Sequence, residues 1–317
     1  MDKLTLALIS GGTSSERQVS LAGGAQVYEA LDKEKYHILR YDPKTDLGKL
    51  ITDAPEIDMA LIILHGPMGE DGTIQGMLDL LDIPYQGSGV LGSALAMNKL
   101  AAKYMYENAG LPMPPYVALR SGEDLDVDRV IAQLGLPIVV KPAVGGSSIG
   151  MSIVKSKETF QEALKKAFVH GPTLILESFI SGVELTSAII GNDELTALPL
   201  VEIIPDKNHE FFDYEAKYTP GLTTEICPAR MDDELTQKAQ AYGKAAHAAL
   251  FCRGYSRTDM ILRDRDLFVI ETNTIPGMTP TSLLPQSARS AGIDFTRLLD
   301  MLIVLSLADY KNKRSQR

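Results

Sequence analysis

The stretch YSRTDMILRDRDLFVIETN, residues 255–273, gives the clearest structural signal in the chain. Two runs rich in aliphatic, aromatic and β-branched residues, 255–262 and 267–271, flank a polar turn at 264–265. This pattern predicts a β-hairpin. The hairpin brings polar residues from its two outer ends onto one face of a sheet, because side chains alternate along each strand.

Three oxygen-bearing side chains are expected to meet there. The turn places Asp259 nearly opposite Glu271, and Asn273 shares the face of Glu271. Oxygen ligands of this kind suit Mg²⁺, which commonly bridges protein carboxylates to substrate phosphates. Arg257 lies on the same face and either stabilises developing negative charge or forms a salt bridge to one of these carboxylates. A shift of one residue in the strand pairing would abolish the site.

A second signal is the run KPAVGGSSIG at residues 141–150. It places Lys141 at a strand end and follows it with glycines and with the hydroxyl groups of Ser147 and Ser148. Glycines let backbone N–H groups approach an anion, serines add hydrogen bonds and the lysine adds charge. The alternative is a hairpin turn with a solvated lysine, but four glycine or serine residues in a row exceed what a turn requires. We therefore favour a polyphosphate site.

Three further loops hold polar residues beside predicted strands. The loop 273–283 is rich in glycine, proline and threonine and leads into a helix, where backbone N–H groups can face a carboxylate or an oxyanion. The loop 65–72 follows a buried strand at the edge where α/β sheets bind ligands. The long polar loop from 205 to about 225 contains the mixed-charge segment 211–218 and is either a functional lid or merely solvated.

The order of predicted elements divides the chain into three units. Apolar strands alternate with helices in the first part, which predicts a parallel α/β sheet, and these strands are 4–9, 37–41 and 59–64. A proline-rich linker at 111–115 precedes a small α+β unit. The expected units are an N-terminal substrate domain at 1–97, a central unit at 98–182 and a C-terminal unit at 183–317, which carries the long polar loop and the predicted metal site.

Two glycine-rich segments lie in the first unit. GGTSS at 11–15 turns into a helix, with Ser15 as the expected cap and Gln18 as its capping-box partner, so that Glu16 falls in the first turn. GSGVLG at 87–92 matches the dinucleotide fingerprint GxGxxG, but the second strand ending in an acidic residue is missing. The sequence therefore does not favour an NAD-dependent enzyme.

The composition is that of a globular protein of 317 residues, 45% of them hydrophobic and 23% charged. A formal net charge of −10 opposes non-specific attraction to nucleic acid or to an anionic membrane surface. The two cysteines, Cys227 and Cys252, form no metal or redox motif. The N-terminal apolar run is too short for a signal peptide, and no stretch approaches the ~18 apolar residues of a membrane span. We expect a cytoplasmic protein that binds neither nucleic acid nor membranes.

Taken in order, six motifs resemble the D-alanine–D-alanine ligase family of the ATP-grasp superfamily. They are GGTSSERQVS at 11–20, HGPMGEDG at 65–72, KP with GSSIGM within 141–151, YEAKY at 214–218, RTD at 257–259 and ETNTIPGM at 271–278. The resemblance covers nearly the whole chain. It implies an ATP-grasp fold preceded by an N-terminal parallel-sheet α/β domain, a combination of α/β and α+β classes. The implied activity joins two D-alanines to D-alanyl-D-alanine through an acyl phosphate, with ATP as co-substrate, for peptidoglycan precursor synthesis.

The same resemblance implies roles around the nucleotide. Residues on the ATP phosphates would be Lys99, Lys141, Ser148 and, at the γ-phosphate, Lys217. Residues at the adenine and ribose would be Glu177, Ile180 and Glu184. Two Mg²⁺ ions, replaceable by Mn²⁺, would be held by Asp259, Glu271 and Asn273.

Roles around the amino acids follow in the same way. Glu16 would meet the ammonium group of the first D-alanine, with His65 also in the substrate site. Arg257 and the Gly277 N–H would stabilise the tetrahedral oxyanion. The carboxylate of the second D-alanine would lie near Ser282 and Leu283, and hydrogen bonds to Glu16 would come from Ser147 and Tyr218.

One departure from the family pattern concerns the nucleotide: the chain has Ser178 after Glu177, where the family commonly has lysine. Tyr218 follows the dipeptide-forming pattern, which favours an amine acceptor. Two alternatives stay open: a sister ligase that uses D-lactate or D-serine as acceptor, and a non-catalytic nucleotide- or amino-acid-binding protein on the same fold. The second predicts loss of Arg257, Glu271 or Lys217, yet all three are present. The family also implies a homodimer.

Overall fold

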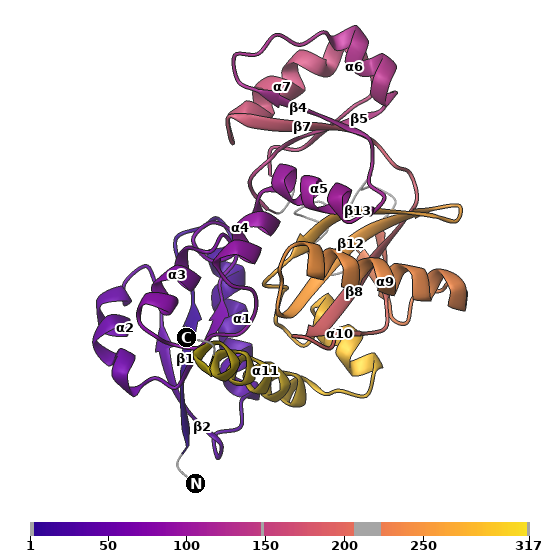
Figure 1. Cartoon of the computed structure of the whole chain (residues 1–317). Helices are drawn as coiled ribbons and strands as arrows, with labels where there is room; N and C mark the ends of the chain where they lie inside the picture. Colours follow the sequence, from indigo (N-terminus) through magenta and orange to yellow (C-terminus); the bar gives the residue numbers. More distant parts are fainter. Residues whose placement is uncertain (1–2, 147–148, 206–222, 316–317) are drawn as a thin grey trace.

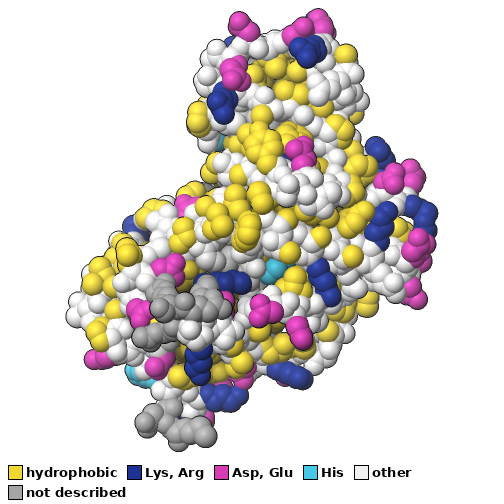
Figure 2. Space-filling model, viewed as in Figure 1, with side chains coloured by type: hydrophobic (Ala, Val, Ile, Leu, Met, Phe, Trp, Pro, Cys, Tyr) yellow, Lys and Arg dark blue, Asp and Glu magenta, His cyan; other side chains and the backbone are white. Residues whose placement is uncertain are grey.

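The computed structural model describes residues 3–146, 149–205 and 223–315, which form three β-sheets connected by helices (Figure 1). Predictions on Ser147, Ser148, Lys217 and Tyr218 therefore lie outside the described residues. Charged side chains of both signs are scattered over the face shown in Figure 2, whereas hydrophobic side chains gather across its middle. Within the described ranges, no helix combines the length and apolar character needed to span a membrane.

The N-terminal sheet is parallel, with the strand order β2-β1-β3. Alternate residues of β1 and β3 enter two different hydrophobic clusters, one on each face, because helices cover both sides of the sheet. The three strands predicted here are confirmed to within one residue at each end. The elements are β1 (Leu4–Ser10), α1 (Arg17–Ala30), β2 (Tyr36–Tyr41), α2 (Leu47–Asp53), a 3₁₀ turn (Ala54–Glu56), β3 (Met59–Ile63), α3 (Thr73–Leu80) and α4 (Val90–Met97).

The start of α1 differs from the prediction. Glu16 occupies the N-cap position and makes no side-chain capping bond, so Ser15 is not the cap and Gln18 closes no capping box. The cause is Ser14, whose hydroxyl accepts a hydrogen bond from the Glu16 N–H at 3.2 Å and donates to the carbonyl of His65 at 2.7 Å. Ser14 thus ties the segment 11–15 to the 65–72 loop, and the segment does not cap α1 through Ser15.

The glycines of the 87–92 segment serve packing. Gly92 lies in α4, and a Cβ at this position would come within 2.8 Å of the Phe251 carbonyl oxygen, so only glycine lets α4 approach the end of α9 (Asp233–Ala249) this closely. Residues 83–85, the strand expected before a dinucleotide fingerprint, contribute only an isolated bridge between Tyr85 and Ala60. The segment that matches the GxGxxG pattern thus lets α4 pack closely and does not follow a strand of the sheet.

The central sheet is antiparallel, with the order β4-β7-β5-β6. Helices α6 and α7 cover one of its faces and bury Val130, Leu134, Phe160 and Leu164 there. The other face is turned toward the C-terminal sheet (Figure 1). The elements are α5 (Lys99–Asn108), β4 (Tyr116–Arg120), α6 (Val127–Leu134), β5 (Ile138–Pro142), β6 (Ser152–Val154), a 3₁₀ turn (Lys157–Thr159), α7 (Phe160–Phe168) and β7 (Thr173–Ser178).

The C-terminal sheet has the order β11-β10-β8-β12-β13, with β9 paired to β8. Helix α9 packs on it through an apolar stripe that includes Leu235, Ala239 and Ala246. The sequence predicted a loop from 205 to about 225. This prediction is wrong at its C-terminal end, because residues 223–226 pair with β10 as a strand. The elements are β8 (Val183–Gly191), β9 (Thr196–Ala197), β10 (Val201–Pro205), β11 (Thr223–Ile226), α9, β12 (Gly254–Arg263), β13 (Asp266–Asn273), α10 (Leu283–Ser290) and α11 (Phe295–Ser315).

The last helix returns to the beginning of the chain. In Figure 1, α11 runs beside β1 and α1, and its residues Leu298 and Leu302 share a hydrophobic cluster with Leu6 of β1. Asp300 of α11 accepts a hydrogen bond from the Tyr36 hydroxyl at 2.8 Å and forms an ion pair with Lys35 at 2.6 Å. The two ends of the chain thus share one core. The unit boundaries expected at residues 97 and 182 remain predictions.

Candidate active site

Two cavities meet at the centre of the structure. The inter-sheet cavity lies between the central and C-terminal sheets. The loop-lined cavity lies between the N-terminal loops, the end of the β12–β13 hairpin and the start of α10. Both are lined by Lys99, Gly145, Gly146 and Glu271. We call the region lined by these four residues the border between the cavities. A group bound there is accessible from either cavity.

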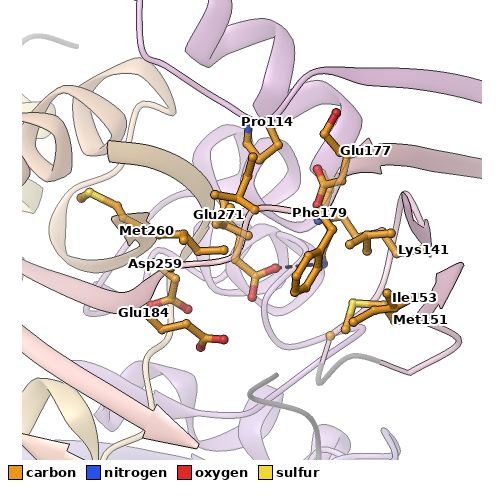
Figure 3. Close-up of a pocket in the computed structure, with 18 of the residues that line it drawn as sticks. Pro114, Lys141, Met151, Ile153, Glu177, Phe179, Glu184, Asp259, Met260 and Glu271 are labelled. Atoms are coloured by element: carbon orange, nitrogen blue, oxygen red, sulfur yellow. Dashed lines mark hydrogen bonds and ion pairs between the residues drawn. The ribbon is translucent and has the colours of Figure 1, made fainter. Parts of the chain in front are cut away.

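The inter-sheet cavity has two apolar walls. Figure 3 shows Met151 and Ile153 together on the side of the central sheet. Ile203 and Ile270 extend the wall formed by the C-terminal sheet. A slot with apolar side chains on both sides suits a flat aromatic base, which buries both of its faces. The residues expected at the adenine and ribose also line this cavity, namely Glu177, Ile180 and Glu184.

A buried charge cluster lies at the β7 end of this cavity. Glu177 forms ion pairs with Lys141 of β5 and, at 2.9 Å, with Lys103 of α5. Burial by itself would raise the pKa of Glu177, but the two ammonium groups outweigh it and hold that pKa below its usual range. Burial lowers the pKa of Lys103, against the attraction of Glu177. Glu177 is therefore an ionised carboxylate held between two cations.

Lys99 occupies the border between the two cavities. It is the first residue of α5, which begins immediately after its N-cap Asn98, whose side chain accepts from the Leu100 and Ala101 N–H groups. Its ammonium donates to the Gly145 carbonyl at 2.5 Å and lies 3.4 Å from a carboxylate oxygen of Glu271. This position lets one cation reach both the loop after β5 and the carboxylate on β13.

The hairpin pairing predicted from the sequence is confirmed. Asp259 is the register partner of Glu271, and Arg257 is the partner of Asn273. The guanidinium of Arg257 donates two hydrogen bonds to Asp259, at 2.8 and 2.9 Å, so the salt-bridge alternative for Arg257 is present in this structure. Arg257 also lines the loop-lined cavity, which leaves it available to an oxyanion there.

The oxygen ligands expected for a divalent cation pass a chemical test. Among the described residues no three acidic, histidine or cysteine side chains converge, so the site would consist of two carboxylates and one amide. Asp259 forms an ion pair with Arg257, and Glu271 forms one with Lys99. Both carboxylates line the inter-sheet cavity. Two hard, anionic oxygen donors suit Mg²⁺. Asn273 lines the loop-lined cavity and accepts a hydrogen bond from the Ile275 N–H at 2.9 Å.

The loop-lined cavity combines two carboxyl groups with an imidazole. Glu16 and His65 are both buried, and Glu70 lies beside them in the wall. Burial lowers the pKa of His65, which favours the neutral ring. Burial also raises the pKa of Glu70 to about 8, although the Gly66 N–H donates to its carboxylate at 2.6 Å. Near neutral pH the cavity thus offers Glu16 beside a neutral imidazole and a protonated carboxyl group, a setting that accepts an ammonium group.

The start of α10 forms the opposite wall. Ser282 is its N-cap residue and Leu283 its first helical residue, so unpaired N–H groups at the helix start lie at the cavity. The Ser282 hydroxyl accepts a hydrogen bond from the Thr279 N–H at 3.2 Å, which fixes the preceding turn. A Cβ at Gly277 would lie 2.9 Å from that hydroxyl, so glycine is required for the loop to pass this close. A helix start of this kind binds a carboxylate.

The sequence analysis missed three residues that the structure places at or behind these cavities. Lys103 and Tyr106 lie on the buried side of α5, and the Tyr106 hydroxyl donates to Thr272 of β13 at 2.8 Å. Glu70 was part of a quoted motif but received no role. Lys103 follows Lys99 by four residues, and Tyr106 follows Lys103 by three. Residues so spaced share one face of a helix, so the sequence could have indicated that all three lie on the same side of α5.

Family models match two segments of the chain. The model described as D-ala D-ala ligase C-terminus matches residues 105–304, and the model described as D-ala D-ala ligase N-terminus matches residues 42–88. The first of these segments contains the central and the C-terminal sheets, and the second contains β3 of the N-terminal sheet.

Named relatives match over almost their full lengths. A protein from Syntrophobacter fumaroxidans named D-alanine--D-alanine ligase is 58% identical over 308 residues, which cover 97% of this chain and 99% of the relative. A protein of the same name from Desulfotalea psychrophila is 53% identical over 315 residues, which cover 99% and 98%.

Solved structures agree in fold. The D-alanine--D-alanine ligase from Bacillus anthracis is 40% identical, with a TM-score of 0.87 over 98% of this chain and 99% of that one. A second structure of the Bacillus anthracis ligase, complexed with ATP, is 37% identical, with a TM-score of 0.85 over 98% and 99%.

Proposed function

The chain belongs to the D-alanine–D-alanine ligase family, and we propose on this basis that its two adjoining cavities carry out the two halves of one ligation. The protein is an ATP-dependent ligase with an ATP-grasp fold, and it joins two D-alanines to D-alanyl-D-alanine with release of ADP. The observation that carries the proposal is the shared border. Lys99 and Glu271 line both the cavity suited to a nucleotide and the cavity suited to amino acids.

ATP would bind in the inter-sheet cavity with its adenine between the apolar walls. The backbone and side chains of the 177–184 segment line the inner end and would contact the adenine and the ribose. The phosphates would then run past Lys141 toward Lys99, which lies at the border. Ser148 and Lys217, which the family pattern assigns to the phosphates, lie outside the described residues. Ser178 donates its hydroxyl to the Leu134 carbonyl at 2.7 Å, so it offers no substitute for the missing lysine.

Divalent cations are the next part of the proposal. Asp259, Glu271 and Asn273 would hold two Mg²⁺ ions, or Mn²⁺ in their place. These ions would neutralise negative charge on the phosphates. That neutralisation favours in-line phosphoryl transfer.

The first half of the reaction would activate one D-alanine. Its ammonium group would lie against Glu16 and His65, both of them buried in the loop-lined cavity. Its carboxylate would then point toward the border, where an oxygen attacks the γ-phosphorus of ATP and ADP leaves. The product is an acyl phosphate. Lys99, which reaches the border from α5, would hold the transferred group in line.

The second half would form the peptide bond. The carboxylate of the second D-alanine would bind at the start of α10, near Ser282 and Leu283. Its amine, once deprotonated, attacks the acyl carbon, and inorganic phosphate leaves. Arg257 and the Gly277 N–H would stabilise the oxyanion, because both line the same cavity. Ser147 and Tyr218 would hydrogen-bond to Glu16 and couple closure of the site to substrate binding, which excludes water from the acyl phosphate.

The cellular setting follows from the product. We place the enzyme in the cytoplasm, in the synthesis of peptidoglycan precursors, where it affects cell-wall biogenesis and cell shape. A homodimer also belongs to the proposal. Val90 and Leu91 of α4 are exposed, as is Phe251 beside that helix, and a second copy of the chain would cover such apolar side chains. Cross-linking at micromolar concentration would show a dimer that Leu91→Glu disrupts.

Acceptor choice is tested in a single reaction. Purified protein is incubated with ATP, Mg²⁺ and equal amounts of D-alanine, D-serine and D-lactate, and the products are identified by mass spectrometry alongside ADP release. We expect D-alanyl-D-alanine with a matching amount of ADP. A mixed dipeptide or a depsipeptide as main product would move the protein to a sister activity, and a lack of ADP would contradict the ligase.

A further inference from the structure

Helix α5 directs three polar side chains toward the two sheets that form the inter-sheet cavity. Lys99, Lys103 and Tyr106 follow one another at spacings of four and three, so they lie along one face of the helix. Lys99 and Tyr106 contact β13, through Glu271 and Thr272. Lys103 contacts the central sheet, through Glu177 of β7. The helix thus links both walls of the cavity by specific polar contacts.

Lys103 is among the most deeply buried charged groups described. Its side chain is 1% exposed, and that of its partner Glu177 is 5% exposed. Its ammonium also lies 4.8 Å from the centre of the Tyr116 ring, at a distance that allows a cation–π contact. Burying a lysine this far from water is costly unless its charge is compensated. Glu177 provides that compensation.

Glu177 has a second cation, and the two cations are placed differently. Lys141 lines the inter-sheet cavity, whereas Lys103 lies behind Glu177 and lines neither of the two cavities. Figure 3 shows Lys141 and Glu177 together at one end of the cavity. Lys141 can therefore give up its ion pair with Glu177 and bind a ligand that enters the cavity. Lys103 cannot reach such a ligand.

The charges of this cluster favour an incoming anion. Two lysines and one glutamate leave an excess of one positive charge in a site that is nearly dry. If Lys141 turned to an anion without Lys103, Glu177 would remain as an uncompensated buried carboxylate, which is strongly unfavourable. With Lys103 present, Glu177 keeps an ion pair while Lys141 moves.

We infer that Lys103 is a positioning residue for the nucleotide phosphates: it keeps Glu177 paired and so releases Lys141 to bind them. The inference rests on the proposed function, because it takes the anion to be the polyphosphate of ATP. Lys103 itself touches neither substrate. Its effect should therefore appear in the binding of the phosphates, because its removal leaves Glu177 in place beside the base and still paired with Lys141.

The test compares two probes that differ only in phosphate. Calorimetry gives dissociation constants for ADP with Mg²⁺ and for adenosine, in the wild type and in Lys103→Met. The variant keeps the apolar length of the side chain and removes its charge. We expect the dissociation constant of ADP to rise about tenfold, because Lys141 stays on Glu177, and that of adenosine to change by less than about twofold. In turnover, the KM for ATP rises while the KM for D-alanine stays unchanged.

Two further variants make the result specific. Lys165→Met makes the same change on the exposed side of α7 and should alter neither dissociation constant. The double variant Lys103→Met with Glu177→Gln removes the buried anion together with one of its cations. In the double variant, the ratio of the ADP dissociation constant to the adenosine dissociation constant should return to within about threefold of the wild-type ratio. The reason is that no buried carboxylate then competes with phosphate for Lys141.

Other outcomes would overturn the inference. An equal loss of ADP and adenosine binding, or a lower melting temperature with an unchanged ratio, would show that Lys103 merely braces the fold. If Lys103→Met does not fold, Lys103→Gln carries the same expectation. Failure of the proposed function is separate, since a wild type that binds ADP but forms no dipeptide contradicts that function while the ratio still reports on Lys103.

Discussion

Glu271 touches both halves of the proposed reaction, because its carboxylate lines both cavities and attracts Lys99 at 3.4 Å. Replacement by glutamine keeps the shape of the side chain and removes its charge. We expect Glu271→Gln to lower ATP-dependent formation of the dipeptide by at least about a hundredfold, because the proposed Mg²⁺ site would lose an anionic oxygen ligand. The measurement is ADP release coupled to dipeptide analysis, with circular dichroism to show an unchanged fold.

The matched control for this change is Glu162→Gln, at an exposed position of α7. It should leave turnover within about twofold of the wild type, as surface substitutions usually have small effects. Near-normal activity in Glu271→Gln itself would show that the carboxylate on β13 is dispensable and would remove it from the proposed metal site.

Glu70 should make the stability of the protein depend on pH. Burial raises its pKa in the folded protein to about 8, from an ordinary value of 4.5. Between these two values the native state holds a proton that the unfolded chain has released, so the free energy of unfolding falls as the pH rises and levels off above about 8. Glu70→Gln removes this component. The stability of the variant relative to the wild type should increase steadily from pH 5 to pH 8.

Urea unfolding at several pH values measures this difference, and Glu162→Gln again serves as the exposed control. A stability difference between Glu70→Gln and the wild type that stays constant from pH 5 to pH 9 would contradict the assignment, since it would mean that Glu70 titrates alike in the folded and unfolded states.

Single residues were predictable where local pattern decides their position. The carboxylates Asp259 and Glu271 came out as near neighbours, because a short turn sets the register of a hairpin to within about one residue. A register shift between Asp259 and Met260, which the sequence did not predict, makes them direct partners. Lys103 could not be found in the same way. Its burial depends on Glu177 of β7. Helical spacing indicates that Lys103 shares a face with Lys99, but it does not show which strand that face contacts.

Elements were predicted well in their interiors and less well at their ends. Strands β1 and β3 of the N-terminal sheet are largely apolar, and burial on both faces makes such runs easy to recognise. The cap of α1 failed because Ser14 bonds to His65 in another loop, a tertiary contact that overrides the local preference of Ser15. The strand β11 was missed because its pairing with β10 decides its conformation.

The contact between α9 and β12 should make the protein sensitive to acid. The His247 ring of α9 shares a 2.7 Å hydrogen bond with the Ser256 hydroxyl of β12, and both residues are buried. Burial lowers the pKa of His247 to about 4 in the folded state, against 6.5 ordinarily. The unfolded chain therefore binds a proton first, and up to about 3 kcal/mol of stability is lost as the pH falls from 6.5 through 4.

His247→Gln tests this contact. Glutamine retains a polar group for Ser256 and does not titrate, so the variant should lose less stability than the wild type between pH 6.5 and pH 4. The control is His37→Gln, at an exposed position of β2, which should follow the wild type. An equally steep acid loss in His247→Gln would assign the effect to other groups.

The molecule as a whole brings its chemistry together from three sheets. The first sheet supplies the loops with Glu16 and His65, the second supplies Lys141 and Glu177, and the third supplies the hairpin carboxylates. The fold class and the order of the sheets could be expected from the alternation of elements and from the family motifs. The return of α11 to β1 could not, because an apolar helix does not reveal which sheet it will cover.

The central claim is that a carboxylate of D-alanine is phosphorylated where the two cavities meet. The most direct test supplies D-alanine labelled with ¹⁸O in its carboxylate, together with ATP and Mg²⁺, and analyses the inorganic phosphate by mass spectrometry. An acyl phosphate intermediate transfers one labelled oxygen to each phosphate released with dipeptide. We predict this transfer. Dipeptide formed with unlabelled phosphate would contradict the acyl phosphate and, with it, the role assigned to the border between the cavities.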